Sequence, residues 1–260
     1  MKEKPSLALT LFLGSLSFLS ADDPLPVSEA GRWTKEEINE QRPAVITPPG
    51  HTTQEKAGAP PSDAIIFFDG SDLSKWQGRG KGGEDAARWL VKDGYMEVVR
   101  GTGSIQTRDQ VEGDCQWHLE WCTPAEVKGN SQGRGNSGVF LGGYPEVQVL
   151  DSFQKDTYPD GQASSLYKRS VALVNASRGP GQWQTYDIIC LREKKGSDGK
   201  VIQPGSITVL HNGIVTQCFV EAGGKTPSGG LQLQDHGNPV RFRNIWCRKL
   251  VVPPVKAPGQ

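Results

Sequence analysis

The sequence predicts an all-β fold, a β-sandwich or jelly roll of antiparallel sheets, and three observations support this. Glycine (32 residues) and proline (18 residues) are more frequent than a helical protein needs, and they suit short strands joined by turns. Strand-like segments follow one another from about residue 64 to residue 250, without an amphipathic helical pattern between them. The dipeptide Asn212–Gly213 indicates a hairpin turn between two of these segments. With 260 residues, the chain is long enough for one large sandwich or for two small domains.

The N-terminus has the features of an export signal. Lys2 and Lys4 precede an apolar run, Leu7 to Leu19, which is too short to span a bilayer comfortably and ends near a small residue, Ala21. We expect residues 1–21 to be a signal peptide that directs the protein to the periplasm or out of a bacterial cell, with no membrane contact after cleavage. An uncleaved membrane anchor is the alternative, because the large Leu19 is a poor residue for a cleavage site.

Residues 22–63 predict an N-terminal extension, since their Pro, Gly and polar side chains leave little to bury. Thr34 and Glu37 have the spacing of a capping box and indicate one short helix within it. We expect the sandwich domain to cover residues 64–252 and a tail to follow at residues 253–260.

Charge and cysteine content limit the classes of partner. Lys+Arg and Asp+Glu are equal at 29 each, which argues against a nucleic-acid partner and is compatible with a saccharide. The five cysteines lack paired metal-binding spacing, so we expect buried small hydrophobes, with one strand-to-strand disulfide as the alternative. We expect no cofactor and no metal. A structural Ca²⁺ at the turn from Asp69 to Asp72 stays open, although a full ligand pattern is absent.

Alternation along three predicted strands gives each an apolar and a polar side: residues 115–122, 231–234 and 240–246. The polar sides hold Gln116, His118 and Glu120, then Gln232 and Gln234, then Arg241 and Arg243. On the apolar side of the last strand we expect Val240, Phe242 and Trp246. If the three strands share a sheet, their polar sides converge in one hydrogen-bonding hollow.

A series of motifs carries a resemblance to a known family. In chain order they are FFDGSDLSKW (67–76), WLVKDG (89–94), the strand end Glu120–Trp121, NSGVFL (136–141), EVQVLD (146–151), GQWQTYDI (181–188), LQDHGNPV (233–240) and FRNIW (242–246). Together these motifs resemble the 3-keto-disaccharide hydrolase family over about residues 64–250. The resemblance implies a concanavalin-like jelly-roll sandwich and cleavage of glycosides that carry a ketone at carbon 3 of the sugar.

Two positions depart from the family's pattern. Cys122 follows the Glu-Trp motif where the family usually has Arg. Tyr144 and Pro145 precede the EVQ segment, where the family often has an apolar residue or Tyr. We therefore expect the substrate preference to differ from that of other members.

The implied chemistry is an elimination followed by hydration. A ketone at C3 acidifies the proton on C2, a general base removes that proton, the enolate expels the group at C1, and water then adds. The enzyme must supply a base, donors for the enolate oxygen and an acid for the leaving oxygen. We expect one carboxylate among Glu120, Glu146 and Asp151 to be the base, and His236 to be a proton shuttle.

The resemblance also suggests which side chains bind the substrate. We expect Arg241 and Gln148 to stabilise developing negative charge, and Asn136 to bond sugar hydroxyls or to order its turn. The complete set of expected substrate-binding residues is His118, Asn136, Gln148, Gln232, Gln234 and Arg241. Arg243 is expected to be structural and paired with a carboxylate.

Two other functions compete with this one. A non-catalytic, lectin-like sugar-binding module would share the fold and much of the polar face, because fold does not determine function. A conventional glycoside hydrolase with two carboxylates is disfavoured, since no paired-acid motif stands on one strand.

Overall fold

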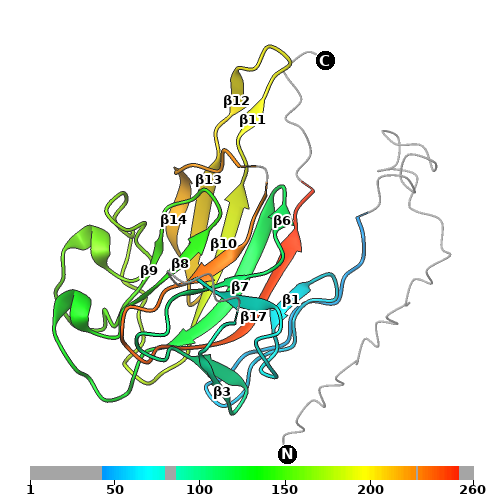
Figure 1. Ribbon diagram of the computed structural model, residues 1–260. Coiled ribbons are helices and arrows are strands. Elements are labelled where there is room, and N and C mark those ends of the chain that lie inside the picture. The colour runs from blue at the N-terminus through cyan, green and yellow to red at the C-terminus, as the bar shows by residue number, and fades with distance from the viewer. Residues whose placement is uncertain (1–42, 80–85, 227, 252–260) are drawn as a thin grey trace, which may run out of the picture. The chain divides into compact units, whose positions relative to one another are not determined.

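The fold is the predicted all-β sandwich. The structure is a computed structural model that describes residues 43–79, 86–226 and 228–251. Its strands form two main antiparallel sheets and two short strand pairs (Figure 1), all within the compact unit Ile46–Gln260. The expected signal peptide, the helix at Thr34 and the tail 253–260 lie outside the described residues. In the described part of the chain, no helix is long and apolar enough to cross a membrane.

The larger sheet has eight strands, in the order β14-β13-β10-β7-β17-β4-β3, and β1 also pairs with β17. The central strands β7 and β17 pair over most of their length. The strand bounds are β1 (Ile65–Phe68), β3 (Leu90–Lys92), β4 (Tyr95–Glu97), β7 (Cys115–Cys122), β10 (Gln184–Leu191), β13 (Ser206–His211), β14 (Ile214–Glu221) and β17 (Arg241–Lys249).

The smaller sheet has five strands in the order β2-β5-β16-β8-β9. Their bounds are β2 (Trp76–Gly78), β5 (Ile105–Thr107), β8 (Ser137–Leu141), β9 (Val147–Val149) and β16 (Leu231–Leu233). Two strand pairs lie apart from the sheets: β6 (Val111–Glu112) with β15 (Ser228–Gly229), and β11 (Lys194–Lys195) with β12 (Val201–Gln203). Two 3-10 turns, η2 (Ser131–Gly133) and η3 (Pro159–Gly161), lie in the loops that flank β8 and β9.

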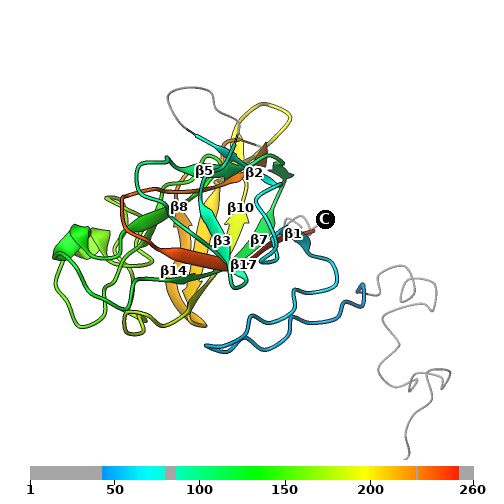
Figure 2. The same cartoon turned by 60° about the horizontal axis from the view of Figure 1, so that its bottom comes forward.

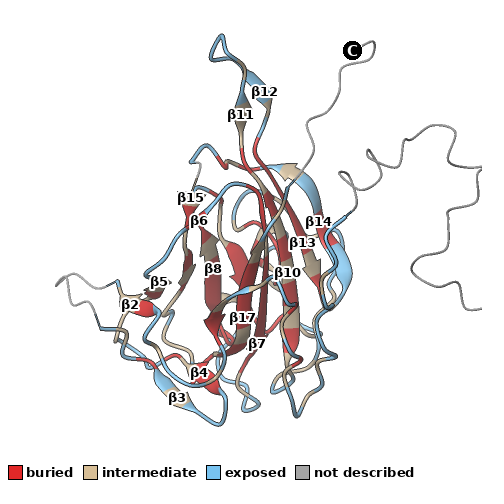
Figure 3. Ribbon diagram, turned by 90° about the vertical axis from the view of Figure 1, so that its right-hand side faces the viewer, coloured by how far each residue is buried: buried red, intermediate tan, exposed pale blue. Residues whose placement is uncertain are grey.

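The core lies between the two sheets, which Figures 2 and 3 show from two further directions. Trp117, Leu119 and Trp121 of β7 belong to the same buried cluster as Leu231 and Leu233 of β16. Fully burying a large apolar side chain contributes about 1.5–3 kcal/mol, so this cluster supplies most of the driving force for folding. Alternation within β7 and β16 therefore predicted the core correctly.

Turn chemistry was also predicted correctly at the NG hairpin. Asn212 (φ 52°) and Gly213 (φ 80°) both have positive φ between β13 and β14. A two-residue hairpin of this type needs positive φ at both central residues, which Asn and Gly accept at low cost.

The expected alternation fails at one point in β17. The strand has a bulge between Arg243 and Trp246, and Asn244 adopts a positive φ of 49°. The extra residue reverses the side on which the following side chains lie. Trp246 consequently stacks on His118, on the outer face of the sheet, rather than joining Phe242 in the core.

The polar sides of the three strands do not share a sheet, which corrects our expectation of one hollow. β7 and β17 are neighbours in the larger sheet, whereas β16 lies in the smaller one. Because the apolar sides of both sheets face the common core, the polar sides face opposite exteriors of the sandwich. The molecule therefore has two polar faces, one on the outer side of each sheet.

A segment before the first strand packs onto the larger sheet and belongs to the compact unit that begins at Ile46. Residues 46–62, the strap, contain few apolar side chains and are held by hydrogen bonds instead. Gln54 exchanges two bonds with the backbone of Trp183, at 2.7 and 3.0 Å. Composition marked this segment as having little to bury, but it did not exclude polar packing.

Candidate active site

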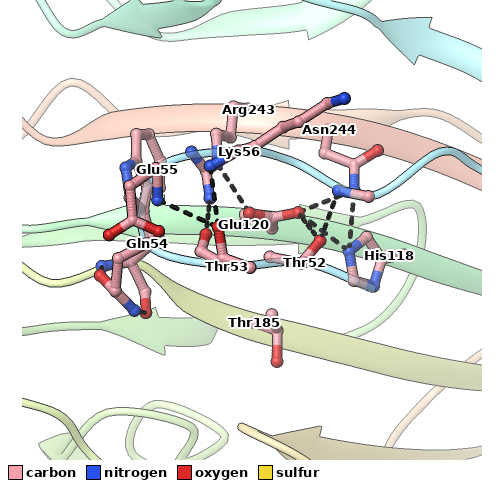
Figure 4. Close-up of polar contacts among 12 residues, drawn as sticks. Thr52, Thr53, Gln54, Glu55, Lys56, His118, Glu120, Thr185, Arg243 and Asn244 are labelled. Atoms are coloured by element: carbon pink, nitrogen blue, oxygen red, sulfur yellow. Dashed lines mark hydrogen bonds and ion pairs between the residues drawn. The ribbon is translucent and has the colours of Figure 1, made fainter. Parts of the chain in front are cut away.

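The outer face of the larger sheet has a fully buried carboxylate, Glu120, at the centre of a hydrogen-bonded cluster (Figure 4). Glu120 Oε2 accepts a bond from Arg243 Nε at 2.7 Å, as expected of a structural Arg243. Its Oε1 accepts bonds from Asn244 Nδ2 at 2.7 Å and from Thr52 Oγ1 of the strap at 2.8 Å. Burial raises the pKa of Glu120, but His118, Asn244 and Arg243 outweigh burial, and the pKa is lowered. Glu120 is a fixed anion whose oxygens are both occupied.

His118 lies beside Glu120 and is also held in place. Its Nδ1 lies 2.9 Å from Asp187 Oδ1, and its ring stacks on Trp246 with centroids 4.8 Å apart. Burial lowers the pKa of His118, but the carboxylates of Asp187 and Glu120 outweigh burial and raise it to about 9. The imidazole is therefore protonated at neutral pH and cannot accept a proton there.

Two further predicted site residues are held in ion pairs. Arg241 Nε lies 2.6 Å from Glu97 Oε2 on the outer face of the larger sheet. Asp151 is buried, and its Oδ2 accepts bonds from Arg134 at 2.6 Å. Its other oxygen accepts a bond from the backbone of Phe153 at 3.2 Å. These contacts suit structural roles better than proton transfer by Asp151 or oxyanion binding by Arg241.

The outer face of the smaller sheet is arranged differently, around Gly138 of β8. Gly138 pairs with Gln148 of β9 on one side. On the other side, the carbonyl of Gly138 accepts a hydrogen bond from the backbone N–H of Gln234 at 3.0 Å. The side chains of Gln148 and Gln234 thus flank a position that has no side chain. A Cβ atom at Gly138 would collide with the carboxyl group of Glu146. Glycine at this position leaves the space that Glu146 occupies.

Glu146 is the carboxyl group of this second face. It directly precedes β9 and lies over Gly138. Within the described residues, its carboxyl oxygens make no hydrogen bond and no ion pair. Burial is the one cause that shifts its pKa, which rises to about 7. A carboxyl group that titrates near neutral pH is suited to general acid–base catalysis.

Three amide oxygens of this face lack a hydrogen-bond partner in the described part of the chain: Asn136 Oδ1, Gln148 Oε1 and Gln234 Oε1. A buried acceptor without a partner costs about 1–3 kcal/mol, so such groups mark strain or an absent ligand. Hydroxyl groups are donors that would satisfy them. The three oxygens are therefore suited to a polyhydroxylated ligand.

Gln132, which the sequence did not single out, orients two of these amides. Gln132 Oε1 accepts bonds from Gln148 Nε2 at 2.7 Å and Asn136 Nδ2 at 3.3 Å. Its Nε2 donates to Gly161 O at 2.8 Å and Thr157 Oγ1 at 3.0 Å. Because Gln148 and Asn136 direct their NH₂ groups to Gln132, their oxygens point elsewhere.

A pair of tyrosines, also missed from the sequence, lies on the Glu146 side of this network. The hydroxyl groups of Tyr158 and Tyr167 are 2.6 Å apart, and the Tyr167 amide donates to Glu146 O at 2.9 Å. Burial and the bond to Tyr167 raise the pKa of Tyr158 to about 12, with a smaller effect from Glu146. Tyr158 therefore keeps its proton and can donate it. Both tyrosines stand in a loop without periodicity, so no pattern indicated them.

His236 is exposed in the loop that follows Gln234. Asp235 holds this loop, because its Oδ2 accepts bonds from the backbone of Gly101 at 2.8 Å and Gly103 at 3.0 Å. The side chain of His236 makes no hydrogen bond to the described residues.

Apart from Asp151, which is buried in its ion pair with Arg134, the predicted site residues separate into two sets. The outer face of the smaller sheet brings together Asn136, Glu146, Gln148, Gln232 and Gln234, with His236 in the adjoining loop. The outer face of the larger sheet has His118, Glu120 and Arg241. The described residues contain no group of three or more His, Cys, Asp or Glu side chains placed to hold a metal ion.

Comparison with known proteins shows the family. The profile of the 3-keto-alpha-glucoside-1,2-lyase-like domain matches residues 63–248. The chain belongs to this family. A curated relative, the 3-keto-disaccharide hydrolase of Bacteroides thetaiotaomicron, is 25% identical over 233 residues, which make up 72% of this chain and 78% of the relative.

Two solved structures from Parabacteroides distasonis, both assigned as glycosyl hydrolases, are similar to this chain. The first is 41% identical with a TM-score of 0.71 and covers 80% of this chain and 92% of its own. The second is 20% identical with a TM-score of 0.53, covers 72% and 94%, and supports the fold alone. The family and the sandwich fold predicted from the motifs are both confirmed.

Membership in the 3-keto-alpha-glucoside-1,2-lyase-like family makes this chain one of a group of glycoside-cleaving enzymes, as expected. The matched region contains both polar faces but begins after the strap. The Thr52 contact that covers Glu120 is therefore made by a segment outside the family domain.

Proposed function

We propose that this chain cleaves glycosides oxidised to the ketone at C3 of the sugar, with Glu146 as the general base. The observation that carries the proposal is the state of Glu146. It is partly buried, lacks a partner among the described residues, has a pKa raised to about 7 and lies over the gap at Gly138. Glu120 and Asp151, the other two candidates, are held in ion pairs.

The proposed reaction has two stages whose atoms balance. Glu146 removes the C2 proton, and the electron pair of that C–H bond forms the enolate of the C3 ketone. The enolate collapses, a C1–C2 double bond forms, and the C1–O bond breaks with the leaving oxygen taking a proton. Water then adds its hydroxyl group to C1 and a proton to C2, so the net reaction is hydrolysis. The ketone is the electron sink, and the reaction therefore requires no cofactor.

Other residues of the face suit the remaining roles. Tyr158, which keeps its proton at neutral pH, is suited to donate to the enolate or leaving oxygen. The unpaired oxygens of Asn136, Gln148 and Gln234 are suited to accept bonds from the sugar hydroxyls. His236 is exposed beside this face and is suited to exchange protons with water. In this assignment, Gln148 binds substrate and does not stabilise charge.

We further propose that the chain is exported and meets its saccharide substrate in the periplasm or outside the cell. The support is the basic and apolar N-terminal sequence. Fractionation of cells that produce the full chain, with sequencing of the mature N-terminus, tests this. Full-length protein in the cytoplasm would contradict it.

The test of the activity uses matched glucosides, one native and one oxidised at C3. We expect cleavage of the oxidised glucoside alone, detected by release of its leaving group. Deuterium at C2 should exchange with solvent or slow the reaction, because that C–H bond breaks. Binding of both compounds without turnover would support the lectin-like module and contradict the proposal.

A further inference from the structure

A hollow of about 410 Å³ lies on the outer face of the larger sheet. This volume is within the range of about 300–1,000 Å³ that is usual for ligand pockets. Three neighbouring strands form its floor. Strand register sets Asp187 of β10 opposite His118 of β7, and His118 opposite Trp246 of β17. Gln116 and Thr185 each lie two positions before a member of this row, so their side chains share its face.

The strap forms one wall of the hollow, through residues 49–52. Thr52 holds this wall against the sheet by its bond to Glu120 at 2.8 Å (Figure 4). The Gly50 amide donates to Ala59 O at 2.8 Å, so the strap folds back on itself. The family domain begins at residue 63, after the strap. The family domain alone therefore does not form this hollow.

Polar groups without a partner gather around the hollow. Four side-chain groups that line it make no hydrogen bond within the described residues: the Gln116 amide, the Thr185 hydroxyl, Asp187 Oδ2 and Asn244 Oδ1. Trp246 Nε1 is a buried donor that also has no partner in this part of the chain. A buried polar atom without a partner marks strain or an absent ligand.

The free oxygens are held in place, and the charges around them cancel. Asp187 Oδ1 lies 2.9 Å from His118 Nδ1, and Asn244 Nδ2 donates to Glu120 Oε1 at 2.7 Å. The second oxygen of Asp187 and the oxygen of Asn244 are thereby left for a ligand. His118, whose pKa is raised to about 9 by the two carboxylates, is cationic at neutral pH, and Arg243 pairs with Glu120. Two cations thus balance two anions.

The mixture of donors and acceptors identifies the class of ligand. A cation site needs acceptors alone, and an anion site needs donors alone. Here the oxygens of Asp187 and Asn244 accept, the indole of Trp246 donates, and the amide and hydroxyl groups do both. Vicinal hydroxyl groups also donate and accept together. The balanced charge and the mixed hydrogen-bonding groups therefore favour a neutral, polyhydroxylated ligand.

We propose that this hollow is a second, non-catalytic binding site, which holds an unmodified sugar ring between the strap and the larger sheet. The proposed reaction takes place over the smaller sheet, so this inference does not depend on it. The site attaches the protein to a saccharide without requiring a ketone at C3, and Glu146 remains free to act on another sugar.

The experiment titrates maltose, an unoxidised glucose disaccharide, into the full chain and follows the indole N–H signal of Trp246 by NMR. Trp246→Phe identifies that signal by its disappearance. Gln116→Ala and Thr185→Val each remove one free polar group from the hollow. Gln106→Ala is the matched control, because Gln106 is a half-buried glutamine on the smaller sheet. Choline and inorganic phosphate serve as a cationic and an anionic probe.

We expect maltose to shift the indole signal of Trp246. Gln116→Ala and Thr185→Val should each raise the Kd read from this signal about fivefold, the effect of losing about 1 kcal/mol of binding. Gln106→Ala should leave the Kd unchanged. The 3-keto derivative of maltose, the oxidised disaccharide, should be cleaved within about twofold of the wild-type rate by all three variants.

Three results would overturn the inference. The first is an indole signal that maltose does not shift, or that only choline or phosphate shifts. The second is an equal Kd for maltose in Gln116→Ala, Thr185→Val and the wild type. The third is loss of turnover in folded Gln116→Ala, which would place the hollow in the catalytic machinery. Because maltose has no ketone, the binding result is independent of whether the chain cleaves 3-keto-glycosides.

Discussion

Glu120 and Glu146 occupy the outer faces of two sheets in the same sandwich, and both are withdrawn from water. Around Glu120, Arg243, Asn244 and Thr52 supply hydrogen bonds to both oxygens, and the pKa is lowered. Around Glu146 no described side chain supplies a bond, and the pKa rises to about 7. Glu120 is fully buried and bonded through both oxygens, whereas Glu146 is partly buried and has no partner among the described residues.

The difference separates structure from function. A buried anion with all its partners is stable and inert, because adding a proton to it would break several bonds. A buried carboxyl group without partners is costly to the fold, and such a cost is characteristic of catalytic sites. The two faces should therefore respond to mutation in opposite ways.

Replacement of Glu146 should have the largest effect. Glu146→Gln keeps the shape of the side chain but removes the base, and general-base catalysis contributes about 10²–10⁴-fold to the rate. We expect kcat on the oxidised disaccharide to fall within that range, while the melting temperature is no lower than that of the wild type. Asp151→Asn serves as a comparison. If Asp151→Asn abolishes turnover in folded protein and Glu146→Gln does not, the base has been assigned to the wrong carboxylate.

Replacement of Glu120 should mainly affect stability. Glu120→Gln leaves Arg243 buried without a carboxylate, and removal of one partner from a buried pair costs about 3–5 kcal/mol. We expect a urea midpoint well below that of the wild type. The kcat of the protein that remains folded should be unchanged. Loss of kcat without loss of stability would mean that the catalytic carboxylate lies on the larger sheet.

How far the sequence could predict this site depends on what alternation reveals. The order of residues in 146–151 placed Glu146 and Gln148 on one side of a strand, and the structure agrees. Alternation does not reveal which sheet a strand joins, so residues 231–234 were wrongly grouped with residues 115–122. The sheet that a strand joins is determined by the strands that pair with it, and these are distant in the chain.

Two further features required coordinates for physical reasons. Asn244 adopts positive φ inside a strand, where a non-glycine residue rarely does, and this bulge turns Trp246 outward. Gln132 acts through three bonds to residues far along the chain and one to Asn136, and a single glutamine in a polar loop carries no periodic signal.

The two faces should contribute to the pH dependence of stability in separate pH ranges. The folded pKa of Glu146 is raised, so its contribution to stability is present below its ordinary pKa and is lost as pH rises through about 7. The pKa of His118 is also raised, and its contribution is present at pH 6 and is lost as pH rises through about 9. Turnover should increase through pH 7, in the window where Glu146 loses its proton and its stabilising effect.

Urea titrations of unfolding at pH 4, 6, 8 and 10 measure these windows. Glu146→Gln should be more stable than the wild type at pH 8, by about 1–2 kcal/mol once partial solvation is allowed for. His118→Gln should remove the decline between pH 6 and pH 10. If Glu146→Gln retains the full decline between pH 4 and pH 8, other groups cause it, and the carboxyl group is solvated in the folded protein.

The smallest effect should come from the strap. Thr52 Oγ1 donates to Glu120 Oε1 at 2.8 Å and accepts a bond from the Gly58 amide at 2.7 Å. Thr52→Val keeps the shape and removes both bonds, so we expect a loss of about 1–2 kcal/mol in the free energy of unfolding.

Thr53→Val is the matched control, because the hydroxyl group of Thr53 bonds within the strap, to the backbone amides of Glu55 and Lys56. Neither variant should alter kcat, because the strap covers the face opposite Glu146. A change in kcat with Thr52→Val, at unchanged stability, would mean that the two faces communicate and that Glu120 belongs to the catalytic machinery.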